Sequence, residues 1–291
     1  MNQAQATHQS IPLQVQVLEQ ISHLPLQLNG VLYQHYPAMK LGQKQAIKFY
    51  STQLAVIAEN IYQQEEQLDW VITAPPCHYL PAGANLLARS VHQLLAKQGI
   101  TTELVEPRLK QQQVSFNSKT EFQNFYNYSK STLEQRIKQR KNELDTLKNN
   151  KQANHLKNKS LIIINDINVT GTQQRFMQQA LEQCQVKSCN WLYIFNIESS
   201  LAKQHPELEH QINHSRIKSL KSFSQVLSDP QTEHTSRCIS RLFNEDDEEF
   251  NYLINHLAVD KRQQIHQLAT QEGRYSGTFF EQKMQRLGSN K

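Results

Sequence analysis

Residues that could hold a phosphorylated sugar follow a short, wholly apolar segment of the chain. Residues 161–164 are Leu-Ile-Ile-Ile, Asn165 and Asp166 come next, and Thr-Gly-Thr at 170–172 precedes a helix-like stretch. If 161–164 is a strand of a parallel sheet, the turn into the helix presents backbone N–H groups and the positive end of the helix dipole. An anion would be stabilised there without a cationic side chain, and Asp166 could accept hydrogen bonds from sugar hydroxyls. The pattern favours a phosphate-binding turn with an acid beside it.

Gly171 would let the backbone approach such an anion closely, in a chain that has 8 glycines in all. No lysine follows it as in a P-loop, and the chain has no GxGxxG dinucleotide fingerprint. Because Asp, Thr and Gly are also common in turns and helix caps, an ordinary strand-to-helix turn explains these residues alone equally well.

Alternating strand and helix patterns are expected to position this turn. An amphipathic helix is predicted after Pro37, with apolar residues such as Ile47, Leu54 and Ile61 at helical spacing. Short apolar segments predict strands with helical patterns between them: strands at 70–76, 100–107, 161–164 and 189–197, helices at 81–98 and 173–184. Residues after 198 are mostly helical, and the acidic run 246–249 is expected to open a helix. We therefore predict the α/β class: a parallel sheet flanked by helices, with an additional mostly helical C-terminal region.

The segment 108–131 is polar and aromatic without a clean period, which predicts a long mobile loop or lid. Phe116 and Phe122 lie there among lysines, a mixture that could stack the bases of single-stranded nucleic acid. The same mixture of aromatic and basic residues would equally well pack within a lid or line a nucleobase pocket. Residues 1–10 are expected to be disordered, and 132–150 to form a charged helix.

The amino-acid composition of the chain limits the kinds of binding partner that are expected. The net charge of +5 is a weak argument for nucleic acid, so that partner is not expected, and the charge suits a cleft for a phosphorylated anion. No apolar run approaches the roughly 20 residues of a membrane helix, and the N-terminus lacks a signal-peptide pattern. The 4 cysteines form no CxxC pair and are interpreted as free thiols. The expectation is a cytoplasmic protein with no membrane partner.

The stretch LIIINDINVTGTQ at 161–173 resembles the phosphoribosyl pyrophosphate (PRPP) loop of type I phosphoribosyltransferases. That loop is an apolar strand, two acidic residues, three variable residues, then Thr-Gly and small hydroxyl or glycine positions. Three positions depart from it: Asn165 replaces the first acid, Thr172 a second glycine, and Gln173 a Thr or Ser. The resemblance implies that Asp166 and Asn165 are the catalytic residues beside the ribose. It also implies that the 5-phosphate is bound by a run of five residues, Val169, Thr170, Gly171, Thr172 and Gln173.

A second stretch, VITAPPCHYLPAG at 71–83, resembles the loop with which the same family grips pyrophosphate, and it comes in the family's order. The resemblance implies that pyrophosphate contacts Thr73, Ala74, Pro75 and Pro76. Cations of the lid, namely Arg108, Lys110 and Lys119, would reach the departing pyrophosphate.

Lys40 and Gly42 resemble a Lys-Gly stretch that precedes the first helix in two subgroups of the family. These are the proteins encoded with tellurite-resistance operons and the competence-related ones. An ordinary solvated lysine before a helix is the alternative for Lys40. The resemblance covers about residues 36–200, which implies a phosphoribosyltransferase-like domain at 36–200, an N-terminal extension or hood at 1–35 and a helical cap or lobe at 201–291.

The implied activity is transfer of ribose 5-phosphate from PRPP to a small nitrogenous acceptor, with release of pyrophosphate. Mg²⁺ is the implied cofactor; it would bridge pyrophosphate oxygens and ribose hydroxyls, and no side chain is assigned to it as a ligand. The acceptor is unidentified, and a homodimer is an alternative to a monomer. Because Asn165 lacks a carboxylate, a non-catalytic protein that senses PRPP or a nucleotide is the alternative function.

Overall fold

The computed structural model of the chain describes residues 11–109, 114–126 and 155–289. Three predictions lie outside these residues: the disorder of 1–10, the helix over 132–150 and the role of Lys110.

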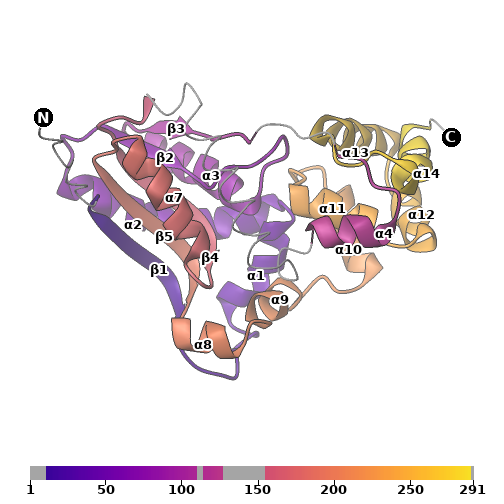
Figure 1. Cartoon of the computed structure of the whole chain (residues 1–291), viewed down its shortest axis with the longest axis horizontal. Coiled ribbons are helices and arrows are strands. Elements are labelled where there is room, and N and C mark those ends of the chain that lie inside the picture. Colours follow the sequence, from indigo (N-terminus) through magenta and orange to yellow (C-terminus); the bar gives the residue numbers. More distant parts are fainter. Residues whose placement is uncertain (1–10, 110–113, 127–154, 290–291) are drawn as a thin grey trace, which may run out of the picture.

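A five-stranded parallel sheet forms the centre of the N-terminal two thirds of the chain (Figure 1). Its strands run in the order β1-β5-β4-β2-β3. Their bounds are β1 Leu13–Ile21, β2 Trp70–Thr73, β3 Glu103–Val105, β4 Ser160–Asn168 and β5 Ser188–Ile197. The sheet and its flanking helices confirm the predicted α/β class.

Helices cover both faces of the sheet because β4 is apolar on both faces. Ile162 and Ile164 pack with α1 Val31–Lys40, α2 Lys44–Gln64 and α3 Gly83–Lys97, whereas Leu161 and Ile163 pack against α7 Thr172–Gln183. This two-sided burial fixes the end of β4, where the polar residues of interest begin.

Three strand predictions need correction in length, among them 100–107, of which β3 covers only Glu103–Val105, and one strand was not predicted. β4 continues beyond 164 through Asn165 and Asp166 to Asn168, since both polar side chains are buried along the ladder. β2 ends at Thr73 and does not include 74–76. The unpredicted β1 pairs in parallel with β5 along most of its length, so the segment from 13 to 21 belongs to the sheet. The domain boundaries at 35 and 200 stay predictions.

The last third of the chain is helical, as predicted. After α8 Ser199–Gln204 and α9 Leu208–Asn213, the helices α10 to α14 gather round a separate apolar cluster, at the far end of the molecule from β1 in Figure 1. We call these five helices the C-terminal lobe: α10 Leu220–Ser228, α11 Ser236–Asn244, α12 Asp247–Asn255, α13 Val259–Glu272 and α14 Thr278–Gly288. The acidic run opens α12 as expected, with Asp246 accepting a hydrogen bond from the N–H of Glu249 at 2.8 Å.

Residues 114–126, predicted to belong to a long mobile loop or lid, include a helix and pack against the C-terminal lobe. The N–H of Phe116 donates to the carbonyl of Ser276 at 3.0 Å, and Phe122 in α4 Lys119–Tyr126 packs edge-on against Phe280 of the C-terminal lobe. Both aromatic rings are buried in the apolar cluster of that lobe, which stabilises the segment there. Buried rings cannot stack on bases, so these two residues do not support nucleic-acid binding.

None of the helices in the described part of the chain is long and apolar enough to cross a membrane. All four cysteines are free and buried, which confirms their interpretation as free thiols.

Glu272 joins the C-terminal lobe to the loop after β2. Its side chain is buried, and its Oε2 accepts a hydrogen bond from the N–H of Leu80 at 2.7 Å, while Oε1 lies 3.4 Å from Nε of Arg274. Burial raises the pKa of Glu272 to about 7, against the opposing effect of backbone hydrogen bonds from Leu80 and Tyr79. The folded state therefore holds the proton more tightly than the unfolded chain, and this contribution to stability is lost as the pH rises from about 4.5 to 7.

The variant Glu272→Gln cannot ionise, so its stability relative to the wild type should depend on pH. Between pH 4.5 and pH 8 the difference in free energy of unfolding should move by roughly 3 kcal/mol in favour of the variant. Urea unfolding at several pH values measures it, with the exposed Glu66→Gln as control. A constant difference across this range would contradict the shifted pKa of Glu272.

Candidate functional site

Asp166 lies near the carboxyl end of β4, buried and in close ionic contact with a lysine from far along the chain. Its Oδ2 accepts from Nζ of Lys40, and its Oδ1 accepts from the N–H of Ile167 at 2.8 Å. The side chain of Asp166 is only 10% exposed and that of Lys40 only 15% exposed. The alternative of a solvated lysine is therefore wrong for Lys40.

The end of α1 positions Lys40 through contacts with the C-terminal lobe. The Lys40 carbonyl accepts from Oγ1 of Thr235 at 2.7 Å, and the Gly42 carbonyl accepts from the N–H of Glu233 at 3.1 Å. Gly42 has φ +92°, and a Cβ there would lie 1.8 Å from the Glu233 carbonyl oxygen. Only glycine allows this approach, so the sequence at 40–42 is fitted to the neighbouring lobe.

The turn after β4 is a left-handed bend that leads directly into a helix. Gly171 adopts a left-handed conformation, φ +67° and ψ +2°, and α7 begins at Thr172 with no side chain capping its first turn. The hydroxyls of Thr170 and Thr172 lie 2.8 Å apart at this end of the helix. Uncapped N–H groups and hydroxyl donors at a helix N-terminus can hold a phosphate.

Two residues at this turn were missed from the sequence. Asn168 accepts the N–H of Gly171 on its Oδ1 at 2.9 Å and so fixes the bend. Arg175 donates from Nη2 to Oγ1 of Thr172 at 3.2 Å, which brings an exposed guanidinium to the mouth of the turn. The signal for Arg175 was its spacing: a residue three positions after the first helical residue lies on the same helix face.

The departures from the family pattern at Asn165 and Gln173 contact each other. Asn165 is buried; its Nδ2 donates to Oε1 of Gln173 at 3.2 Å, and its Oδ1 accepts the N–H of Asp166 at 2.9 Å. This amide pair ties the end of β4 to the first turn of α7. The pair holds these two elements in place but adds no charge to the site.

The loop after β2 lies beside the same sheet edge, because Thr73 is in register with Ile163 of the neighbouring β4. It offers few donors, however. Pro75 and Pro76 have no amide hydrogen, and the N–H of Cys77 donates to the carbonyl of Pro107 at 3.2 Å. The structure thus places residues 73–76 at the end of the strand next to β4, with less hydrogen-bonding capacity than the prediction assumed.

Arg108 is engaged with this loop. Its Nη1 donates to the carbonyls of His78 at 2.9 Å and Tyr79 at 2.8 Å, and lies 3.1 Å from Sγ of Cys77. Burial raises the pKa of the Cys77 thiol to about 11, so that thiol stays protonated near neutral pH.

Lys119, the other described cation predicted to reach pyrophosphate, is exposed at the start of α4, a helix anchored on the C-terminal lobe.

A protein-family model described as PRTase ComF-like matches residues 15–287, where PRTase stands for phosphoribosyltransferase. The chain belongs to the ComF-like phosphoribosyltransferase family. The match runs from β1 through α14, so this family includes the N-terminal strand and the C-terminal helices that lie outside residues 36–200. The family resemblance is confirmed, and the tellurite-resistance subgroup stays a prediction. A search of curated proteins finds no match.

The residues of this ComF-like chain do not fit a Mg²⁺ ion held by the protein at the ribose. Mg²⁺ requires oxygen ligands in near-octahedral geometry. Both oxygens of Asp166 have partners, one of them an ammonium, and Asn165 has an amide in place of a carboxylate. Within the described residues no three His, Cys, Asp or Glu side chains cluster as a metal site. Mg²⁺ carried by the pyrophosphate of PRPP itself stays a prediction.

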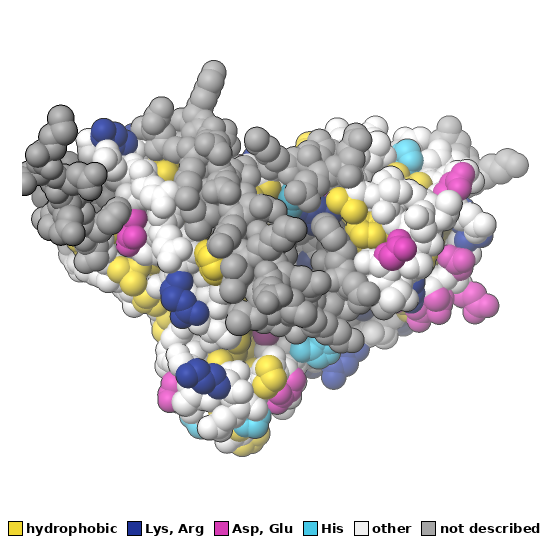
Figure 2. Space-filling model, in the orientation of Figure 1, with side chains coloured by type: hydrophobic (Ala, Val, Ile, Leu, Met, Phe, Trp, Pro, Cys, Tyr) yellow, Lys and Arg dark blue, Asp and Glu magenta, His cyan; other side chains and the backbone are white. Residues whose placement is uncertain are grey.

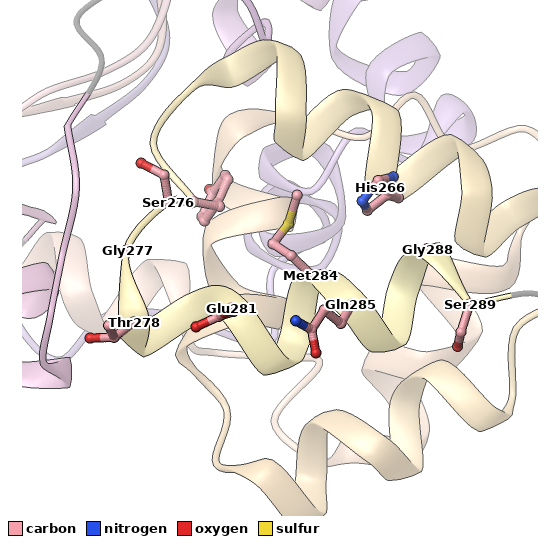
Figure 3. A pocket seen from close by; sticks show the side chains of 10 residues that line it. His266, Ser276, Gly277, Thr278, Glu281, Met284, Gln285, Gly288 and Ser289 are labelled. Carbon is pink, nitrogen blue, oxygen red and sulfur yellow. The ribbon is translucent and has the colours of Figure 1, made fainter.

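A cavity of about 760 Å³ lies between α13 and α14 of the C-terminal lobe (Figure 3). Its lining includes His266, Tyr275, Glu281 and Met284 but no lysine or arginine. A phosphorylated sugar needs cations or converging N–H donors, and none of the residues predicted for PRPP lines this cavity. The sheet edge at Asp166 is therefore the better candidate for a phosphorylated-sugar site.

Proposed function

We propose that this ComF-like protein binds PRPP at the carboxyl edge of β4 and transfers its ribose 5-phosphate to a small nitrogenous acceptor, releasing pyrophosphate. One observation carries the proposal: a buried carboxylate, Asp166, precedes by only four residues the threonine that leads into the uncapped N-terminus of α7. A carboxylate and an anion-binding turn at this separation suit the two ends of one ribose 5-phosphate.

The 5-phosphate would accept hydrogen bonds from the first N–H groups of α7 and from Thr170 and Thr172, with Arg175 adding a positive charge. The ribose hydroxyls would then face Asp166. During transfer, the bond from the anomeric carbon to the pyrophosphate oxygen breaks and its electron pair leaves with pyrophosphate. The acceptor nitrogen forms the new bond with its lone pair and releases its proton to water. Asp166 would stabilise the positive charge that develops on the sugar between these events, with the part of its negative charge that the ammonium of Lys40 does not neutralise.

The surface charge also supports a small anionic ligand over nucleic acid. On the described part of the face in Figure 2, lysine and arginine side chains lie in separate small groups and form no broad basic patch. A nucleic-acid site would require such a patch along the phosphate backbone.

A second candidate is a protein that binds PRPP or a nucleotide without turning it over. The loop after β2 favours it, because Pro75 and Pro76 supply no N–H donors and Arg108 already binds the loop's own carbonyls. In this case the ribose 5-phosphate half would bind as above, and the leaving pyrophosphate would lack stabilisation.

Pyrophosphate release separates the two candidates. The protein is incubated with PRPP, Mg²⁺ and a panel of nucleobases and other small amines, and pyrophosphate is measured by an enzyme-coupled assay. We expect release that depends on one acceptor class, together with thermal stabilisation by PRPP worth about 3 kcal/mol at a hundredfold excess over Kd. Stabilisation without release would select the sensing protein. Neither effect at millimolar PRPP would contradict both candidates.

A further inference from the structure

The ammonium of Lys40 lies beside the carboxylate that the proposed function assigns to the ribose. Nζ of Lys40 contacts Oδ2 of Asp166, and the other carboxylate oxygen is held by the N–H of Ile167. A Mg²⁺ ion that approached Asp166 would meet a positive charge already in place, which repels it strongly in a site of low polarity.

The lysine is held there by its surroundings. Nζ lies 5.6 Å from the centre of the Tyr36 ring, a distance at which the ring face attracts a cation. Burial, with a contribution from Asp166, holds the pKa of Tyr36 well above its usual value, so the Tyr36 hydroxyl stays neutral. Tyr36 therefore adds no negative charge to the one that Asp166 presents to Lys40. The contacts of residues 40–42 with Glu233 and Thr235 keep the end of α1 from withdrawing.

We propose that Lys40 takes the place of a divalent cation at the ribose, so that this protein binds the ribose 5-phosphate half of its ligand without Mg²⁺. The inference rests on the proposed function. An ammonium has three N–H donors, and one is used by Asp166, which leaves donors for a ribose hydroxyl. Asp166 can accept from a neighbouring hydroxyl at the same time. The pair would thus bind the sugar diol as a unit, and Lys40 would select a ligand that presents adjacent hydroxyls beside a phosphate.

Ribose 5-phosphate is the probe, because it lacks the pyrophosphate that would bind Mg²⁺ independently of the protein. Isothermal titration calorimetry gives its Kd in EDTA and in millimolar Mg²⁺. For the wild type we expect the two Kd values to agree within about twofold. For Lys40→Met we expect binding in EDTA to weaken at least about tenfold. Mg²⁺ should restore part of this loss, since the freed Asp166 oxygen can then ligate the ion.

Two further variants keep the experiment decisive. Lys48→Met, an exposed lysine on α2, should bind like the wild type in both buffers. The double variant Lys40→Met/Asp166→Asn leaves no buried unpaired charge, so it should fold even if Lys40→Met does not. It should bind weakly in EDTA and show no response to Mg²⁺, because no carboxylate remains for the ion.

The results also separate this inference from the proposed function. Wild-type binding that is at least tenfold weaker in EDTA than in Mg²⁺ would overturn the role of Lys40 and leave the proposed function standing. So would a folded Lys40→Met that binds as tightly as the wild type in EDTA. If the wild type binds neither ribose 5-phosphate nor PRPP, in EDTA or in Mg²⁺, both the role of Lys40 and the proposed function are overturned.

Discussion

Asp166→Asn is expected to slow PRPP-dependent pyrophosphate release by about 10²–10³-fold while the protein stays folded. The amide has nearly the shape of the carboxylate and can still accept a hydrogen bond from Lys40. It lacks the negative charge that stabilises the sugar when the bond to pyrophosphate breaks. The loss should therefore appear in kcat more than in KM, because the charge matters most in the transition state.

Stability must be measured beside activity in this variant, because Asp166 is paired and buried. Removing one partner of a buried ion pair costs up to about 3–5 kcal/mol, so the assay is run well below the measured unfolding temperature. Asp260→Asn, an exposed acid in the first turn of α13, is the matched control and should retain full activity. A folded Asp166→Asn protein with wild-type kcat would remove Asp166 from the mechanism.

Gly42→Ala is expected to lower the free energy of unfolding by at least about 3 kcal/mol, through overpacking of a site without room. The new Cβ would lie 1.8 Å from the backbone carbonyl oxygen of Glu233, and since a Cβ is bonded directly to the main chain, neither atom can rotate away. The variant should also move Lys40, two residues earlier, and weaken ribose 5-phosphate binding.

Gly99→Ala is the matched control for this substitution. Gly99 has a similar left-handed conformation, φ +82°, but no atom lies within 4 Å of the position of its Cβ. It should lose only the conformational cost of about 1–2 kcal/mol. Urea unfolding of both variants gives the comparison. Equal losses would mean that Gly42 is required for its backbone conformation alone, and that the C-terminal lobe does not approach residue 42 so closely.

The parts of the fold that the sequence predicts well are local. The strand, turn and first helical turn around Gly171 follow one another in the chain, and each has a residue pattern that needs no distant partner. The alternation of such units predicted the parallel sheet, and the composition of the last third of the chain predicted its helices. The sequence predicts a close backbone approach at Gly171, and the left-handed conformation found there is one that few other residues adopt without strain.

The parts that could not be predicted depend on distant contacts. Lys40 and Asp166 are 126 positions apart, and no local pattern distinguishes a lysine that will be buried in a pair from one that stays solvated. β1 is an edge strand whose apolar–polar alternation holds only over 13–17 and is broken at Leu18 and Glu19, so its full length follows from its pairing with β5. Phe122 lies in a polar segment and is buried only because the C-terminal lobe accepts it.

The amide of Gly171 gives the most direct test of the central claim, that the turn after β4 holds the phosphate of ribose 5-phosphate. Selective ¹⁵N-glycine labelling yields one amide signal for each of the 8 glycines, and the Gly171 signal is identified by its loss in Gly171→Ala. On titration with ribose 5-phosphate, the Gly171 signal should shift and reach saturation. The signal of Gly99, which follows the C-terminal end of α3, should stay in place. A stationary Gly171 signal at saturating ligand would contradict the account.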